Sequence, residues 1–204
     1  MSEKSNFLIR RVHSLLGIIP IGIFLCVHFC LNSSVFLNGF STYEITIAGM
    51  KAIPLIVFAE LLIIAIPIIF HGIYGIWIVY LAKNNALKFK YYRNWMFYLQ
   101  RITALITLIF VIIHVYTLRL MQHEPGAIIN TLVMHLQNPV FFVLYIIGVL
   151  SAIFHFANGF FTFLISWGIT IGEHSQNIFS KVSALIFLAM GVWGVGILMK
   201  IASF

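Results

Sequence analysis

Residues 53–82 read IPLIVFAELLIIAIPIIFHGIYGIWIVYLA, and their only acidic or basic side chains are Glu60 and His71. A helix needs about 20 predominantly apolar residues to cross the ~30 Å hydrocarbon core of a bilayer, so this stretch is long enough. Its residues lack the alternating polarity of an outer-membrane barrel strand. We therefore predict a transmembrane helix here, kinked at Pro67, because an interior proline leaves a backbone carbonyl without its partner.

Four further apolar stretches accompany this one. They lie at about 12–32, 101–120, 138–167 and 180–203. Hydrophobic residues make up 62% of the 204 residues and charged residues only 8%, whereas a soluble domain carries about 25% charged residues. The connecting segments are too short to fold alone, at about 33–52, 83–100 and 121–137. The sequence therefore predicts an all-α membrane protein, a single membrane domain over 1–204 with five transmembrane helices.

Basic residues concentrate on one side of the predicted helices. Nine lie on the side of the N-terminus: Lys4, Arg10, Arg11, Lys83, Lys88, Lys90, Arg93, Arg101 and Lys181. Three lie on the other side: Lys51, Arg119 and Lys200. The positive-inside rule then predicts a cytoplasmic N-terminus and an external C-terminus. The net charge of +7 indicates topology rather than nucleic-acid binding.

The first apolar stretch, 12–32, follows basic residues as a signal peptide does. It is longer than a typical signal core and has no small-residue cleavage site, so we expect it to be retained as a helix. Cys26 and Cys30 lie one helical turn apart within it, which is a poor geometry for a disulfide. With no other cysteine in the chain, a thiolate-bound zinc or iron–sulfur site is excluded.

Four of the eight histidines lie inside apolar stretches, each on a different predicted helix: His28, His71, His114 and His155. Ionisable groups within a membrane are costly, and they usually face the bundle interior and mark function. At 1.5 Å per residue, His28 and His114 each lie about 8 Å from the outer ends of their helices. His71 and His155 both belong to the inner half. Each level of the membrane therefore offers two histidines from two helices.

Two histidines from facing helices suit the axial positions of one haem. An iron with both axial positions filled by protein transfers electrons rather than binding oxygen. The residues therefore predict two b-type haems stacked across the bilayer. Small residues beside the ligands would leave room for the porphyrins: Gly72, Gly75, Gly148 and Gly159. Alternatively, each histidine is a polar residue that bridges two helices. A metal other than haem iron is a further alternative, although no carboxylate or thiolate joins either pair.

Polar residues near the cytoplasmic ends could bind the propionates of an inner haem. Ser14 precedes His28 by 14 residues, and Gln100 precedes His114 by the same number. This spacing places both polar residues on the ligand-bearing faces of their helices. Arg11 and Arg101 lie at the same level and could pair with the carboxylates. Three more basic side chains share that level: Arg10, His13 and Arg93. For the arginines, ordinary snorkelling to the membrane interface is the alternative.

Glu60 is the one carboxylate within a predicted transmembrane helix. It precedes His71 by 11 residues and therefore shares its inward face, about 16 Å further out. A carboxyl beside an outer haem could exchange protons with a quinone bound there, which makes Glu60 a candidate catalytic residue. A neutral, hydrogen-bonded glutamic acid is the alternative.

Four separated blocks of the chain resemble a known family. They are RRVHSLLGIIPIGIFLCVH (10–28), PIIFHGIYGIWI (67–78), RNWMFYLQRITALITLIFVIIH (93–114) and GVLSAIFHFANGFFTF (148–163). The chain is similar to the dihaem cytochrome b membrane-anchor subunits of succinate:quinone oxidoreductases, that is, of succinate dehydrogenase and fumarate reductase. It looks most like the single-anchor succinate dehydrogenase form of Bacillus-type bacteria. The blocks cover four of the five predicted helices in order.

The resemblance implies roles that the residues alone do not. His71 and His155 would bind the cytoplasm-proximal haem, and His28 and His114 the distal one. The chain would lie in the bacterial cytoplasmic membrane and dock a flavoprotein and an iron–sulfur subunit of succinate dehydrogenase near the basic loop 83–101. It would pass electrons to menaquinone near the outer side without oxidising succinate itself. Some dihaem relatives carry an acid beside the fourth ligand, which is absent here, so we expect no proton path of that kind.

Two other functions fit parts of the same pattern. A dihaem cytochrome b of a formate dehydrogenase or hydrogenase would have the same haems but a molybdenum or nickel–iron partner. A haem-free transporter would use the histidines as a proton relay, and Pro20 and Pro67 would then break its helices near the midplane. The identity of the soluble partner distinguishes the first alternative from a succinate dehydrogenase anchor. A reduced b-type absorption spectrum distinguishes a haem protein from the haem-free transporter.

Overall fold

The computed structural model describes residues 3–37, 39–121 and 126–204, which form helices and connecting turns. The helices are α1 (Glu3–Ile18), α2 (Pro20–Asn32), η1 (Ser33–Phe36), α3 (Phe40–Lys51), α4 (Ile56–Ala59), η2 (Glu60–Ala65), α5 (Ile66–Leu81), α6 (Tyr92–Val115), η3 (Tyr116–Leu120), α7 (Ala127–Gln137), α8 (Pro139–Ser166) and α9 (Glu173–Ala202). Here η1 is a 3-10 helix, and η2 and η3 are π-helical. Within the described residues, five segments are long and apolar enough to cross a membrane: Asn6–Phe36, Ile56–Leu81, Tyr92–Leu120, Pro139–Ser166 and Glu173–Ala202. The predicted all-α fold with five long apolar helices is confirmed.

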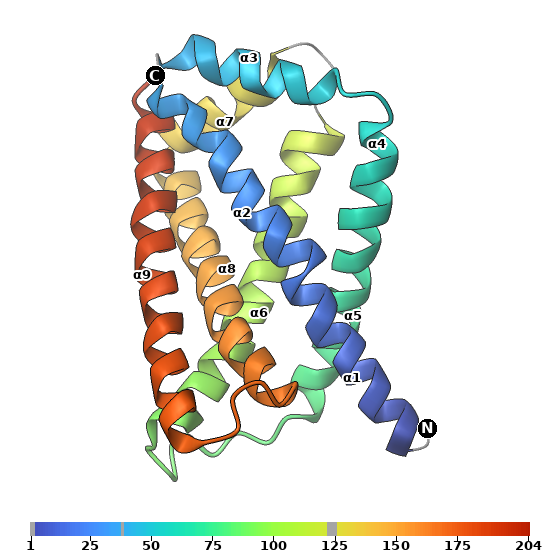
Figure 1. The fold of residues 1–204 in the computed structure, drawn as a ribbon. Coiled ribbons are helices and arrows are strands. Elements are labelled where there is room, and N and C mark those ends of the chain that lie inside the picture. The colour runs from blue at the N-terminus through green and yellow to red at the C-terminus, as the bar shows by residue number, and fades with distance from the viewer. Residues whose placement is uncertain (1–2, 38, 122–125) are drawn as a thin grey trace.

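The five long segments form one bundle (Figure 1). The α1–α2 segment crosses it diagonally, with α8 and α9 on one side and α4 and α5 on the other. The N-terminus, the α5–α6 loop and the α8–α9 loop lie at one end, which we call the N-terminal end. Helices α3 and α7 lie across the opposite end together with the C-terminus, and we call this the C-terminal end.

The buried core lies mainly between α6, α8 and α9. Tyr145 and Ile153 of α8 are almost fully enclosed, and Ile197 of α9 packs in the same cluster as Tyr145. Elsewhere, large apolar side chains point outward, such as Ile73 (67% exposed) and Val192 (77% exposed). A water-soluble monomer rarely shows so continuous an apolar surface, because its exposure to water is costly. Lipid is the solvent that suits it.

Three helices begin well before the predicted boundaries, the first of them α1, which starts at Glu3 rather than near 12. Helix α6 starts at Tyr92 rather than near 101, and α9 starts at Glu173 rather than near 180. The first turns carry polar and aromatic residues of the kind found at the membrane interface, so hydropathy does not reveal them although the backbone remains helical. The start of α8 lies where expected, because Asn138 Oδ1 accepts a hydrogen bond from the Val140 N–H at 3.0 Å, which caps the helix.

The two segments at the C-terminal end, expected as loops, each contain a helix. Tyr43 of α3 and Ile129 of α7 are buried in a cluster with residues of η1 and α9. Gly39 and Gly126 precede these helices with φ of 73° and 76°, a backbone conformation that favours glycine. Helices of this length are marginal alone, so their formation depends on the apolar contacts beneath them.

Candidate functional site

The four membrane histidines meet in two pairs inside the bundle. The ring centres of His71 (α5) and His155 (α8) lie 6.0 Å apart, with an angle of 82° between the ring planes. Those of His28 (α2) and His114 (α6) also lie 6.0 Å apart, at 87°. These are the two pairs expected from their depth along the helices. We call His71 and His155 the inner pair, and His28 and His114 the outer pair.

The separation within each pair fits two imidazoles on opposite sides of one metal ion. A metal–imidazole bond is about 2 Å, and the ring nitrogen lies on the order of 1 Å from its ring centre, so the two centres should be ~6 Å apart. Both pairs have this spacing. If the two imidazoles of each pair were only hydrogen-bonded to each other, the two pairs would not need to have the same spacing between ring centres.

Each pair supplies two protein ligands to any metal that it holds. Among the residues that the structure describes, no group of three or more His, Cys, Asp or Glu side chains could hold a metal ion. A structural zinc site uses four protein ligands and a catalytic one three. The four nitrogens of a porphyrin would fill the other positions around a metal at either pair. The donor set fits haem iron.

His71 has a close partner in His13, which the sequence placed only among the basic side chains near the cytoplasmic ends. Its ring stacks on that of His13 of α1, with the centres 4.1 Å apart and the planes at 6°. His71 Nδ1 lies 3.0 Å from the His13 carbonyl oxygen. A carbonyl can only accept, so Nδ1 carries the proton and Nε2 keeps the lone pair needed to bind a metal.

His155 is held in the same way from the other side of the bundle. Its Nδ1 lies 3.1 Å from the Gln100 carbonyl oxygen and therefore donates to it. The Gln100 amide nitrogen lies 3.1 Å from the same Nδ1, but two donors cannot bond, and this amide donates to the His155 carbonyl at 3.0 Å. Asn158 donates to Gln100 Oε1 at 2.7 Å. Nε2 of His155 is thus also the nitrogen available to a metal.

The outer pair has a different setting. Asn32 donates to the His28 carbonyl at 2.7 Å and accepts from the Tyr43 hydroxyl at 2.9 Å, which ties α3 to the turn after His28. The Tyr145 ring centre lies 5.9 Å from that of His114. Nδ1 of His114 is buried and has no hydrogen-bond partner among the described residues. A buried imidazole nitrogen without a partner is costly, so the outer pair differs from the inner pair, in which both Nδ1 atoms donate to backbone carbonyls.

Side chains of neighbouring helices lie close to the glycines that were predicted to leave room for a porphyrin. A Cβ at Gly148 would overlap the Phe110 ring, and one at Gly72 would lie 3.1 Å from Leu108. The same atom at Gly75 would lie 3.4 Å from His13 Nε2, and at Gly159 3.3 Å from the Gln100 amide. These glycines therefore let neighbouring helices and the partners of the histidines approach closely.

The residues expected to bind propionates make other contacts. Gln100 is occupied by His155 and Asn158, as described above. The Arg11 guanidinium lies over the Trp167 ring at 5.3 Å from its centre, and Arg101 donates to the Phe97 carbonyl of its own helix. Ser14 is partly buried on α1, next to His13. A propionate role for these four residues stays a prediction.

Glu60 forms an ion pair near the C-terminal end. Its Oε2 lies 2.6 Å from an Arg119 guanidinium nitrogen, and the two side chains are 36% and 43% exposed. Both residues belong to π-helical segments, η2 and η3, and such segments are frequent at functional sites. The sequence placed Arg119 only among the external basic residues, so this pairing was missed. Glu60 is thus paired with a basic side chain of another transmembrane segment.

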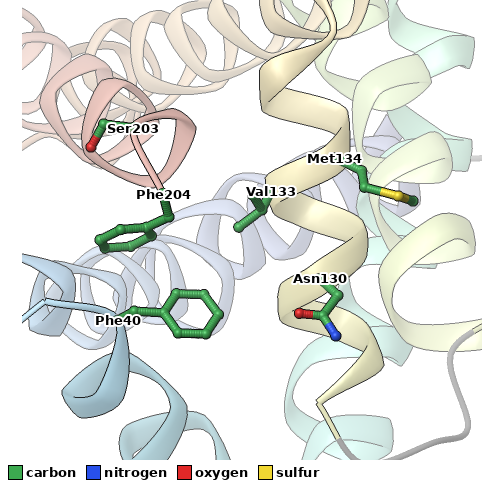
Figure 2. A pocket seen from close by; sticks show the side chains of 6 residues that line it. All are labelled: Phe40, Asn130, Val133, Met134, Ser203 and Phe204. Atoms are coloured by element: carbon green, nitrogen blue, oxygen red, sulfur yellow. The ribbon is translucent and has the colours of Figure 1, made fainter.

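A hollow of about 610 Å³ opens at the C-terminal end between α3, α7 and α9. Figure 2 shows Phe40 and Phe204 on one side of it and the α7 side chains on the other. It is lined by Phe40, Asn130, Val133, Met134, Ser203 and Phe204. None of these residues belongs to the histidine pairs or to the Glu60–Arg119 ion pair, so we do not assign the site to this hollow.

Comparison with known proteins gives two matches. Residues 81–198 match the family described as succinate dehydrogenase/fumarate reductase transmembrane subunit. The chain is also similar to the succinate dehydrogenase cytochrome b558 subunit of Bacillus subtilis (strain 168). The two are 43% identical over 196 residues, which cover 95% of this chain and 96% of that protein.

Proposed function

Because the chain belongs to the succinate dehydrogenase/fumarate reductase transmembrane subunit family, we propose that it anchors a succinate dehydrogenase in the membrane and carries its electrons to menaquinone. We propose two b-type haems as the carriers, with His71 and His155 as axial ligands of the inner haem and His28 and His114 as those of the outer haem. Haem iron supplies one-electron transfer without oxygen binding when both axial positions are filled by histidine.

The spacing of the histidines is the observation that supports two haems most directly. Both pairs have ring centres 6.0 Å apart, and each pair joins two different transmembrane helices. The cytochrome b558 name of the relative agrees with a haem protein. The protein's own contribution is to orient the imidazoles and, at the inner pair, to engage Nδ1 so that Nε2 is left for a metal.

The positive-inside rule supports a cytoplasmic N-terminal end. The α5–α6 loop at this end contains Lys83, Lys88 and Lys90, and the N-terminus and the α8–α9 loop lie beside it in the bundle. The fold therefore gathers at one end the basic residues that the sequence distributes over three segments. With this orientation, the inner pair lies toward the cytoplasm and the outer pair toward the external face.

We propose that the flavoprotein and iron–sulfur subunits dock on this cytoplasmic end. Two strongly exposed apolar side chains lie there outside the spanning segments, Leu87 and Ile171, both 84% exposed. Arg93 donates to Gln176 at 2.6 Å and so links the starts of α6 and α9 at this end. Exposed apolar residues surrounded by polar ones are typical of protein interfaces.

We further propose that menaquinone is reduced near the outer haem and that Glu60 exchanges protons there. Replacing Glu60 by Gln should lower quinone reduction at least tenfold while both haems are retained, because the amide cannot take up or release a proton. Steady-state quinone reduction by the purified complex measures this. The variant Glu44→Gln, at an exposed acid on α3, serves as the control and should resemble wild type.

A second variant separates proton exchange from the ion pair itself. Arg119→Gln removes the same contact but keeps the carboxyl group. We expect it to retain more activity than Glu60→Gln. Equal activity in the two variants, or an unchanged rate in Glu60→Gln, would assign Glu60 a structural role only.

A redox titration of the purified complex tests the proposed function as a whole. We expect two b-type transitions with different midpoint potentials and a flavin-containing partner that co-purifies. A molybdenum or nickel–iron partner would instead indicate a formate dehydrogenase or hydrogenase type of complex. A purified chain without a reduced b-type absorption spectrum would indicate a haem-free transporter.

A further inference from the structure

His13 and His71 form a reciprocal contact between α1 and α5. His71 Nδ1 donates to the His13 carbonyl at 3.0 Å, and His13 Nε2 lies 3.1 Å from the His71 carbonyl and donates to it. The two rings stack at 4.1 Å with nearly parallel planes. Each histidine therefore binds the backbone of the other, and the contact keeps both rings and both helices in a single relative position.

Glycines at matching positions make this contact possible. Gly17 follows His13 by four residues, and Gly75 follows His71 by four. Side chains on a helix lean toward its N-terminus, so the residue at i+4 covers the carbonyl of residue i. A Cβ on Gly17 would lie 2.6 Å from His71 Cε1, and one on Gly75 would lie 3.4 Å from His13 Nε2. With glycine there, each carbonyl is open to the opposite imidazole.

Gln100 gives the other inner ligand an equivalent contact. The His155 Nδ1–H donates to the Gln100 carbonyl, and the Gln100 amide donates to the His155 carbonyl. Glycine again stands four residues after the ligand, at Gly159, close to the Gln100 amide. Both inner ligands are thus held by a residue of a neighbouring helix that exchanges backbone hydrogen bonds with them.

We propose that His13 is a positioning residue for the inner haem, and that it sets the orientation of His71 and the electron density that this ligand donates. The proposal rests on the proposed haem function. A hydrogen bond from the distal N–H of a metal-bound imidazole fixes the ring and raises its basicity. A more basic ligand stabilises the ferric state. His13 maintains this bond by holding its own carbonyl against His71, so its loss should favour the ferrous state.

The variant His13→Ala tests this in the intact complex. Partners of metal-bound histidines typically change metal properties 10–100-fold when mutated. We expect the reduced-to-oxidised equilibrium of the inner haem to rise about tenfold, which corresponds to ~59 mV for one electron. The outer haem should keep its potential. The low-spin EPR signal of the inner haem, which depends on imidazole orientation, should also shift.

Two further variants keep the test decisive if His13→Ala folds poorly. His13→Gln retains a donor at nearly the reach of Nε2 and should restore the inner potential toward the wild-type value. His13→Phe retains the stacked ring without the donor and should not. The control is His174→Ala, at an exposed histidine near the same end of the bundle, which should leave both haems unchanged.

The outcomes distinguish this proposal from the proposed function. Two haems in the wild-type complex with an unchanged inner potential and EPR signal in His13→Ala would overturn the role of His13 alone. Equal shifts in the potentials of both haems would also overturn it, because they would indicate a general packing defect. Equal loss of both haems in His13→Ala and His13→Gln would do the same. A wild-type complex without b-type haem would overturn the function itself.

Discussion

Replacing His28 or His114 by Leu is expected to remove one haem per protein, the outer one, and to leave the inner haem in place. Leucine has a similar volume but no lone pair, so the iron loses an axial bond while the apolar packing largely remains. The pyridine haemochrome assay should give one haem per chain instead of two. The remaining haem should keep its wild-type potential, because the outer pair and the inner pair share no residue.

The reverse variants test the pairing. His71→Leu or His155→Leu should remove the inner haem and spare the outer one, and the two members of each pair should give matching spectra. His135→Leu provides a control near the outer level. This imidazole stacks on the Phe141 ring with the centres 4.4 Å apart and belongs to neither histidine pair, so both haems should remain. Loss of the inner haem in His28→Leu would contradict the pairing.

Replacing Gly17 by Ala is expected to abolish or strongly reduce binding of the inner haem. The new methyl group would lie 2.6 Å from His71 Cε1 and 3.1 Å from its Nδ1, well inside van der Waals contact. The ring must move, and Cε1 is bonded to the nitrogen that would bind the iron. Overpacking of this kind costs about 1–3 kcal/mol, and it displaces the ligand itself. Inner haem content should fall at least tenfold, measured as haem per protein.

Helix propensity alone predicts that this substitution stabilises α1, so the two expectations differ in direction. Alanine stabilises a helix interior by about 1 kcal/mol relative to glycine. The control Gly49→Ala, on α3, introduces the same methyl group where no atom lies within 4 Å, and it should keep both haems. A Gly17→Ala complex with two haems of unchanged potential would show that His71 is not confined by α1.

The sequence predicted much of the fold because membrane insertion depends on local composition. Runs of apolar residues predicted five long helices, and the fold confirmed them. The family inferred from four blocks, including those around His28 and His155, was confirmed by the comparisons. Boundaries were less accurate. The first turns of α6 and α9 carry interfacial residues, so hydropathy did not reveal where these helices begin. Helices α3 and α7 form only where they cover the end of the bundle, so hydropathy did not reveal them either.

The sequence by itself determined which histidines lie in the membrane and at which depth, because rise per residue and hydropathy are properties of a single helix. Only the tertiary structure decided what surrounds each ring. The His13–His71 contact, the engagement of Gln100 by His155 and the Glu60–Arg119 ion pair each join different helices. Such contacts depend on how helices rotate and cross, which is set by side-chain packing between them. Residues far apart in the chain determine that packing jointly, so no single stretch of sequence reveals it.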